Sequence, residues 1–269
     1  MYDMGRTRTA AVAGYFYPAD PGDLAAAVKG YIENAVDPPA ELRGRCPKAL
    51  IGPHAGYAYS GPVAGSAYAL VLPFAGALRR IVLLGPAHRV RFRGLAASTA
   101  ETFATPLGEM QVDSQAIAAA SELPGVTFND HAHAQEHSLE AHLPFLQIVC
   151  PQALLIPFAV GSASAEQVAD VLDLLWGGPE TLIVVSSDLS HYYDYATARR
   201  LDSETSAAIV RMKPEELGPD SACGRDGICG LLQASVAHGL TAWAVDLCSS
   251  GDTAGDRDKV VGYGAYAFA

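Results

Sequence analysis

Unbroken apolar runs alternate along the chain with stretches in which apolar residues recur every three or four positions. Runs without an intervening polar position predict strands that are covered on both faces of a sheet. The predicted strands are Ala49–Gly52, Ile81–Gly85, Leu154–Val160, Thr181–Ser186, Trp243–Cys248 and Val260–Phe268.

The stretches between these runs have helical spacing. Leu24, Val28 and Ile32, for example, recur at every fourth position and would share one face of a helix. The predicted helices are Asp23–Val36, Gly65–Leu72, Ser114–Leu123, Ser138–Val149, Ser164–Trp176, Ser203–Met212 and Asp226–His238. Strands that alternate with helices predict an α/β fold, with a central, largely parallel or mixed sheet flanked by helices. No linker or internal repeat interrupts this pattern, which predicts a single domain over residues 1–269.

The composition fits a protein with a large buried core. Half of the 269 residues are apolar and 17% are charged, which excludes a disordered or fibrous chain. The formal net charge is −11 and no extended basic stripe occurs, which argues against nucleic acid or a membrane surface as a partner. No apolar run is long enough to span a membrane, and the N-terminus lacks the apolar segment of a signal peptide.

The cysteines do not suggest a disulfide framework. Their number is odd, their spacing is wide and no CxxC pair occurs, which favours reduced thiols and a cytoplasmic location. The five are Cys46, Cys150, Cys223, Cys229 and Cys248.

Polar residues suited to chemistry follow the ends of three predicted strands. His54 and His88 each follow one strand, and Asp188 and His191 follow a third. Ligands of open α/β sheets bind beyond the carboxyl ends of the strands, so these side chains are expected to meet at one edge. Taken singly, each histidine has the alternative of an ordinary loop position, and Asp188 that of a helix cap. Their joint occurrence beside Gly, Pro and Ser favours shaped turns around a ligand.

A second cluster lies in Asp130–His142, which holds four of the eight histidines. Its last two histidines are five residues apart, which is not the spacing of a helical zinc motif. His131 and His133 are expected to be loop residues. The remaining polar residues fall at the predicted start of a helix, where free N–H groups favour anions, and a solvated capping turn is the alternative. The candidates for chemistry there are Glu136, His137 and Glu140.

Cys223 lies just before the last predicted helix. A thiol at a helix N-terminus has a lowered pKa, which suits metal binding and redox chemistry. The alternative is a small buried apolar residue. Cys229 falls inside the helix among leucines, so packing is expected there.

Two imidazoles with a thiolate or carboxylate form a donor set for iron, copper or zinc, but not for magnesium or calcium. Three protein ligands with open positions indicate a catalytic rather than a structural metal site. Asp188, His191 and His137 would then orient ligands or transfer protons.

Several strings of the sequence resemble the Memo family, whose prokaryotic members are named AmmeMemoRadiSam system protein B. The most specific strings are PHAGYAYSGP at Pro53–Pro62 and EHSLEAHLP at Glu136–Pro144. The others are Ala13–Pro18, Leu84–His88, Thr105–Gly108, Ser187–His191 and Cys223–Arg225. The matches run in order over nearly the whole chain.

The resemblance implies a fold like that of the class III extradiol ring-cleavage dioxygenases, which are non-haem iron enzymes. It implies that His54, His88 and Cys223 bind the metal, with the cysteine in the place of a glutamate in the dioxygenases. Asp188 and His191 match further pocket residues, and His191 resembles an acid–base group. The implied cofactor is iron (Fe²⁺) or copper, with zinc less expected.

A thiolate ligand changes the redox properties of the metal, so ring cleavage does not carry over directly. The resemblance implies a metal-dependent redox or dioxygenase-like protein with a small-molecule or peptide substrate, and the family name implies a radical SAM partner. Two alternatives stay open: a non-catalytic module that binds a peptide or phospho-ligand in the same pocket, and a metal-dependent hydrolase. The catalytic candidates are His191, Asp188 and His137, and the candidates for substrate contact are Tyr57, Glu136, Glu140 and Phe16.

Overall fold

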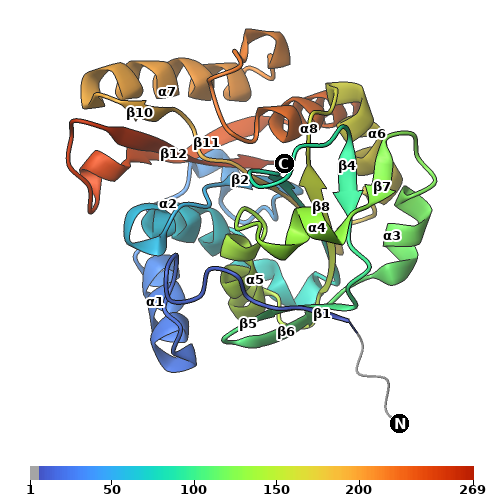
Figure 1. Ribbon diagram of the computed structural model, residues 1–269. Helices are drawn as coiled ribbons and strands as arrows, with labels where there is room; N and C mark the ends of the chain where they lie inside the picture. The colour runs from blue at the N-terminus through green and yellow to red at the C-terminus, as the bar shows by residue number, and fades with distance from the viewer. Residues whose placement is uncertain (1–5) are drawn as a thin grey trace.

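The computed structural model describes residues 6–269. Within these residues, nine strands form one mixed sheet with helices on both of its faces (Figure 1). The order across the sheet is β10 (His191–Tyr193), β12 (Val260–Phe268), β2 (Ala49–Gly52), β9 (Thr181–Ser186), β3 (Arg80–Pro86), β8 (Leu154–Val160), β4 (Leu95–Ala97) and β7 (Val126–Phe128), with β11 (Ala242–Ser249) paired to β12 outside this path. The predicted α/β class with a mixed sheet is confirmed.

The centre of the sheet consists of four parallel strands, β2, β9, β3 and β8. Ile51 and Leu84 both lie opposite Val185, so β2, β9 and β3 end at nearly the same level. The outer pairings of β12 with β2 and of β4 with β8 are antiparallel. The carboxyl ends of the parallel strands therefore lie together at one edge.

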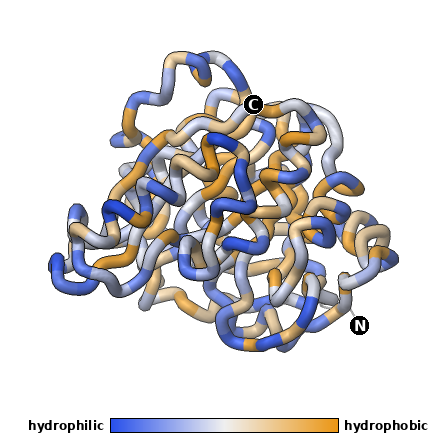
Figure 2. The backbone as a smooth tube through the Cα atoms, turned by 90° about the horizontal axis from the view of Figure 1, so that it is seen from above, coloured by the Kyte–Doolittle hydropathy of each residue, from blue (hydrophilic) through white to orange (hydrophobic). Residues whose placement is uncertain are grey.

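The two faces of the central strands pack into two separate apolar cores. In β2, Leu50 belongs to one core, and Ala49 and Ile51 belong to the other. Every residue of β2 is buried, which explains why these strands appear in the sequence as unbroken apolar runs. Figure 2 shows apolar segments running through the middle of the molecule, with hydrophilic ones toward its periphery.

Seven of the α-helices cover the faces of the sheet (Figure 1). One face is covered by α1 (Pro21–Glu33), α2 (Tyr57–Ala69) and α5 (Leu143–Val149), and the other by α3 (Ser114–Ala120), α6 (Ala165–Leu175), α7 (Tyr195–Val210) and α8 (Arg225–Ala237). The remaining elements are the short helix α4 (Asp130–Ala134), a small sheet of β1 (Thr7–Arg8), β5 (Thr102–Thr105) and β6 (Gly108–Gln111), and the 3-10 helices η1 (Ala40–Leu42), η2 (Leu72–Ala77), η3 (Glu140–His142), η4 (Pro214–Glu216) and η5 (Ser250–Asp252).

Local sequence explains where the helices begin. Asp20 precedes α1, and its side chain accepts hydrogen bonds from the backbone N–H groups of Gly22 and Asp23. Ser164 and Gln167 form a capping box at the start of α6. Such caps satisfy donors that the first helical turn leaves free.

Three predicted helices begin at other residues than expected. α2 begins at Tyr57 instead of Gly65, because Gly61 and Pro62, which disfavour a helix, lie within its first half. α7 begins at Tyr195 instead of Ser203, where Asp194 caps it. The predicted helix from Ser138 is a turn followed by η3 and α5.

One predicted strand has a different environment from the one expected. β11 pairs with β12 at the margin of the sheet, and only its end residues, Ala242 and Ser249, are buried, whereas the residues between them are partly or fully exposed. The prediction that this strand is covered on both faces is therefore wrong.

Two general expectations from composition can be compared with the structure. The five cysteines are free thiols. Among residues 6–269, no helix has both the length and the apolar character needed to cross a membrane.

A buried carboxylate anchors the N-terminal segment to the rest of the molecule. Glu140 is fully buried and forms an ion pair with Arg8. Its oxygens also accept hydrogen bonds from the backbone N–H groups of Ala11 and Val12, at 2.8 and 3.0 Å, and from the Tyr17 hydroxyl at 2.5 Å. The prediction that Glu140 contacts a substrate is therefore corrected, because structural donors occupy both of its oxygens.

Replacing this carboxylate is expected to destabilise the protein strongly. Glu140→Ala leaves the Arg8 guanidinium buried without its counter-charge, which typically costs about 3–5 kcal/mol. The free energy of unfolding from urea titration measures the loss. Glu204→Ala is the matched control, because it breaks an exposed pair with Arg200 that is worth at most about 1 kcal/mol. Equal urea midpoints for both variants would contradict the assignment.

Candidate metal centre

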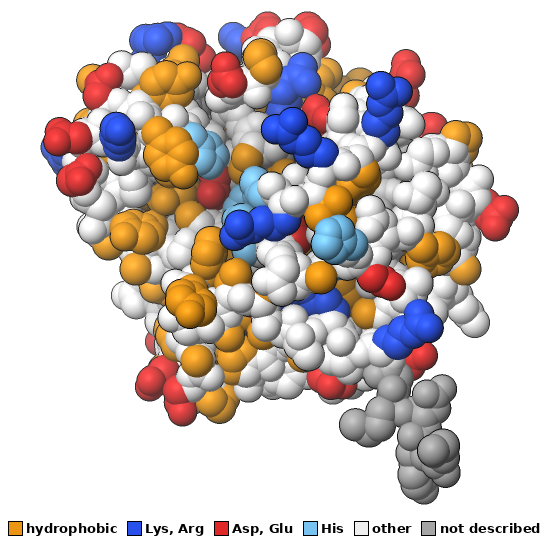
Figure 3. Space-filling model, in the orientation of Figure 1, with side chains coloured by type: hydrophobic (Ala, Val, Ile, Leu, Met, Phe, Trp, Pro, Cys, Tyr) orange, Lys and Arg blue, Asp and Glu red, His pale blue; other side chains and the backbone are white. Residues whose placement is uncertain are grey.

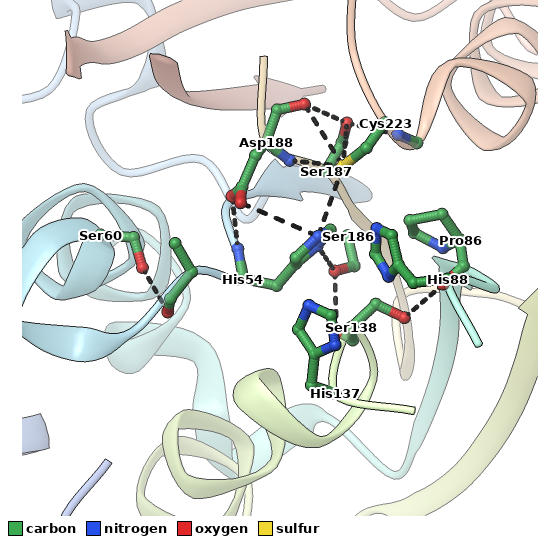
Figure 4. A network of polar contacts seen from close by, with 12 residues as sticks. His54, Ser60, Pro86, His88, His137, Ser138, Ser186, Ser187, Asp188 and Cys223 are labelled. Atoms are coloured by element: carbon green, nitrogen blue, oxygen red, sulfur yellow. Dashed lines mark hydrogen bonds and ion pairs between the residues drawn. The ribbon is translucent and has the colours of Figure 1, made fainter. Parts of the chain in front are cut away.

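The edge formed by the parallel strands brings the predicted site residues together (Figure 4). His54, His88 and Asp188 each lie two residues beyond the last residue of their strand, which is β2, β3 and β9 respectively. Cys223 comes from the turn before α8, a helix that packs on the other face of the sheet. The ring centroids of His54 and His88 are 5.2 Å apart, and Cys223 Sγ lies 3.3 Å from His54 Nε2.

The donor atoms of this cluster have the spacing that a single ion requires. One donor atom each from His54, His88 and Cys223 lies within 4.8 Å of the other two. Protein nitrogen and sulfur ligands bind transition metals at about 2.0–2.3 Å, so ligands of a shared ion lie about 3–4.5 Å apart. Two imidazoles and a thiolate therefore fit one borderline-soft metal ion here.

Glu136 holds the His88 side chain. Its carboxylate accepts hydrogen bonds from the backbone N–H of His88, at 2.5 Å, and from Nδ1 of the same residue, at 2.9 Å. Burial raises the pKa of Glu136, but the hydrogen bonds from His88 and from the backbone of Ser138, with the electrostatic attraction of the His88 ring, outweigh it and lower the pKa to about 2. The carboxylate can only accept, so His88 Nδ1 carries the proton and Nε2 is the nitrogen left for a metal.

Donor atoms of His88, Glu136 and His137 also lie within 4.8 Å of one another. However, Oε1 of Glu136 already accepts from His88 Nδ1 and from the backbone N–H groups of His137 and Ser138, at 2.9, 2.9 and 3.0 Å. An oxygen with three donors has no lone pair left for an ion. We therefore assign Glu136 to the orientation of His88, which corrects the expectation that it contacts substrate.

Asp188 lies beside the cluster and lines the adjoining cavity. One carboxylate oxygen accepts a hydrogen bond from the backbone N–H of His54 at 2.8 Å, and the other lies 3.9 Å from His54 Nε2. Burial raises the pKa of Asp188 to about 7. Its carboxyl group can therefore hold or release a proton near neutral pH.

His191 presents a free ring nitrogen at the same cavity. Its Nδ1 donates to the carbonyl of Leu189 at 2.8 Å, which leaves Nε2 without a proton. Burial lowers the pKa of His191. The next residue, Tyr192, has φ of +62°, a left-handed conformation that is uncommon for a bulky residue. Such strain often accompanies functional sites, and sequence reasoning missed Tyr192 because no local signal marks it.

His137 and Phe16 form an aromatic wall. The His137 ring stacks on His88 with centroids 4.6 Å apart, and its centroid lies 4.7 Å from that of Phe16. Burial lowers the pKa of His137 to about 4, so the ring is neutral at pH 7. Its Nδ1 is buried and makes no hydrogen bond to any residue that the structure describes.

A cavity of about 770 Å³ opens in front of these side chains, within the size range of small-molecule sites. Figure 3 shows histidine side chains gathered in a hollow on this face, with basic side chains beside it. The predicted residues that line the cavity are Phe16, His54, His88, His137, Asp188 and His191. Sequence reasoning missed Tyr59, Arg89, Tyr192, Lys259 and Tyr263, which also line it.

Comparison with known proteins identifies the family of the chain. The family model described as "Memo-like protein" matches residues 8–267. The chain belongs to the Memo family. One relative, a "MEMO1 family protein" of Archaeoglobus fulgidus, is 36% identical, and the match covers 96% of this chain and 97% of the relative. A relative in Methanosarcina barkeri is also 36% identical, covering 96% and 98% of the two chains, and one in Thermotoga maritima is 33% identical, covering 95% and 97%.

Two side chains of this Memo family member differ from their predicted roles. The Tyr57 hydroxyl donates to the carbonyl of Ala141 at 2.7 Å inside the core, and Tyr57 does not line the cavity. Tyr59, on the same helix, does. The expectation of a lowered thiol pKa at Cys223 is also wrong, because burial and the Asp188 charge raise the pKa above that of an ordinary thiol.

The expectation that His131 and His133 lie in a loop is wrong as well. Both residues belong to α4. His133 is buried, and its Nε2 lies 2.9 Å from the carbonyl oxygen of Ala96. Neither residue lines the cavity in front of the cluster.

The turn that begins at Glu136, the residue that holds His88, packs tightly against the end of β3. The Ser138 hydroxyl donates to the carbonyl of Pro86 at 2.8 Å. A Cβ atom at Gly85 would lie 2.7 Å from Ser138 Oγ and 3.0 Å from Leu139 Cδ2. Only glycine leaves room for the turn at this distance.

We expect Gly85→Ala to push the turn away from β3 and to destabilise the protein by about 1–3 kcal/mol, the usual cost of overpacking. Gly30→Ala in α1 is the control, because its Cβ would meet open space and alanine favours a helix by up to about 1 kcal/mol. Urea unfolding should therefore move in opposite directions for the two variants. Unchanged stability of Gly85→Ala would show that the turn is not constrained there.

Proposed function

We propose that His54, His88 and Cys223 bind one transition metal ion, iron or copper rather than zinc. We further propose that the protein uses this ion in a redox or dioxygenase-like reaction on a small-molecule or peptide substrate. The observation that carries the proposal is that donor atoms from three separate segments lie within 4.8 Å of one another, and that two of these residues, His54 and His88, line the large cavity.

The donor set supports a redox metal over a hard cation. Thiolate and imidazole ligands favour iron, copper and zinc over magnesium and calcium. A bound iron or copper ion would supply electron transfer at the floor of the cavity. Three protein ligands leave coordination positions open, as in catalytic sites.

The residues around the cluster are suited to binding and to proton transfer. The Asp188 carboxyl group, with a pKa of about 7, can give or take a proton beside the ligands. The His191 Nε2 can accept a proton on the cavity side. Phe16 and His137 provide an aromatic wall against which a planar or apolar group of the substrate would pack.

The family name of the prokaryotic members supports a radical SAM protein as a partner in the same reaction sequence. Co-expression and co-purification with such a protein from the same genome would test this part of the proposal.

A second candidate function is a binding module without catalysis. Arg89 and Lys259 line the cavity, and neither side chain forms an ion pair within residues 6–269. Two unpaired cations on a chain with net charge −11 favour an anionic ligand, such as the phosphate or carboxylate of a peptide. In this case the histidines would contact the ligand directly.

Metal content tests the leading proposal. Protein purified without oxygen should hold about one equivalent of iron or copper, and His54→Ala and Cys223→Ala should each abolish it, because each removes one of only three protein ligands. His238→Ala is the control, since this ring stacks on Trp176 and does not line the cavity. Elemental analysis gives the readout, and full metal in both site variants would refute the proposal.

Oxygen uptake with a panel of catechols then separates the remaining candidates. Bound zinc without oxygen uptake would favour a hydrolase. No bound metal, together with tight binding of acidic or phosphorylated peptides that Arg89→Ala weakens, would favour the binding module. Fluorescence polarisation of labelled peptides measures that affinity.

A further inference from the structure

A buried serine contacts the ring of His54 on the side away from Cys223. Ser186, the last residue of β9, is fully buried, and its Oγ lies 2.6 Å from His54 Nδ1 and 2.7 Å from the carbonyl oxygen of Ser138 (Figure 4). A hydroxyl has one proton and a carbonyl oxygen can only accept. The Ser186 proton therefore points to Ser138, and Ser186 Oγ must accept from His54 Nδ1.

This chain of hydrogen bonds determines which nitrogen of His54 is free. With the proton on Nδ1, the lone pair of the ring is on Nε2, and this is the nitrogen that faces Cys223 Sγ at 3.3 Å. His54 is 1% exposed, so water cannot replace Ser186 as the partner of Nδ1. The folded protein therefore favours the tautomer of His54 that has its proton on Nδ1.

The turn Glu136–Ser138, which supplies the Ser138 carbonyl, also holds the ring of His88. Glu136 accepts from His88 Nδ1, and two residues later Ser138 provides the carbonyl that orients Ser186. The Glu136 carboxylate additionally accepts from the backbone N–H of Ser138, at 3.0 Å, which ties the two ends of the turn together. One turn thus reaches Nδ1 of both histidines, directly at His88 and through Ser186 at His54.

We propose that the turn Glu136–Ser138, with Ser186 as its relay, is a single positioning unit that makes both imidazoles present Nε2 to the metal. Ser186 and Glu136 are positioning residues in this arrangement. The proposal rests on the proposed metal site, but its statement about ring tautomers concerns the metal-free protein and can be tested alone.

The tautomer of His54 is the first test. Long-range ¹H–¹⁵N spectra of metal-free protein labelled with ¹⁵N-histidine should show His54 with its proton on Nδ1, and loss of the signals in His54→Gln assigns them. In Ser186→Ala, the single tautomer should give way to a mixture or to the Nε2–H form. A wild-type ring protonated on Nε2, or an unchanged tautomer in Ser186→Ala, would overturn the relay.

Metal affinity is the second test, measured by titrating Zn²⁺ as a diamagnetic probe against a chromophoric chelator. Ser186→Ala should weaken binding by about 10–100-fold, the usual effect of losing a partner that orients a histidine ligand. Ser186→Thr keeps the hydroxyl and should restore most of the affinity. Ser138→Ala is the matched control, because it removes the hydroxyl bond to Pro86 but keeps the carbonyl that Ser186 needs.

The outcomes of these tests distinguish a failure of the positioning proposal from a failure of the proposed function. A wild-type protein that binds no metal would refute the proposed function, while the tautomer spectra still decide the relay. Wild-type affinity in Ser186→Ala, or an equal loss in Ser138→Ala, would overturn the positioning role. In the double variant Ser186→Ala with Glu136→Gln, a shared unit predicts a loss smaller than the product of the two single losses, whereas independent residues predict the product.

Discussion

The parallel pairing of β2, β9 and β3 is the constraint on which the site depends. Hydrogen bonds along these strands keep them in register, and apolar packing on both faces of the sheet keeps them in place. Because the strands run in one direction and end nearly level, residues far apart in the sequence meet at one edge. A site made from the ends of buried strands is more rigid than one built on loops, which suits the narrow tolerances of metal binding.

Two buried carboxylates four residues apart, Glu136 and Glu140, hold other parts of the site in place at this edge. Glu136 holds His88, whereas Glu140 holds Arg8 and the backbone of the segment that carries Phe16. The carbonyl of Phe16 in turn accepts from the backbone N–H of Tyr57 at the start of α2. Each buried charge is therefore satisfied by several donors, which is the condition for burying it at tolerable cost. One carboxylate orients His88, a proposed metal ligand, and the other positions a wall of the cavity.

The thiol of Cys223 adds a further physical condition. Burial and the neighbouring Asp188 charge oppose its ionisation, so proximity to α8 does not by itself produce a thiolate. A bound cation would supply the missing stabilisation, since metal ions deprotonate coordinating thiols. Metal binding and thiolate formation would then be one event. The neutral imidazoles of His54 and His137 fit the same picture, because burial lowers the pKa of both rings and keeps them unprotonated.

The sequence by itself determined the α/β class, most strands and the strand-end positions of His54, His88 and Asp188. These follow from local patterns, because a strand buried on both faces must be apolar throughout and its end is marked by Gly, Pro or Ser. The sequence also identified the family, through motifs that occur along nearly the whole chain. Only the tertiary structure decided the roles of Glu136, Glu140, Ser186 and Tyr57. Whether a carboxylate orients a histidine, pairs with Arg8 or faces a cavity depends on which distant groups fold against it, and burial, which sets the pKa of Cys223 and Asp188, is likewise a property of the whole fold.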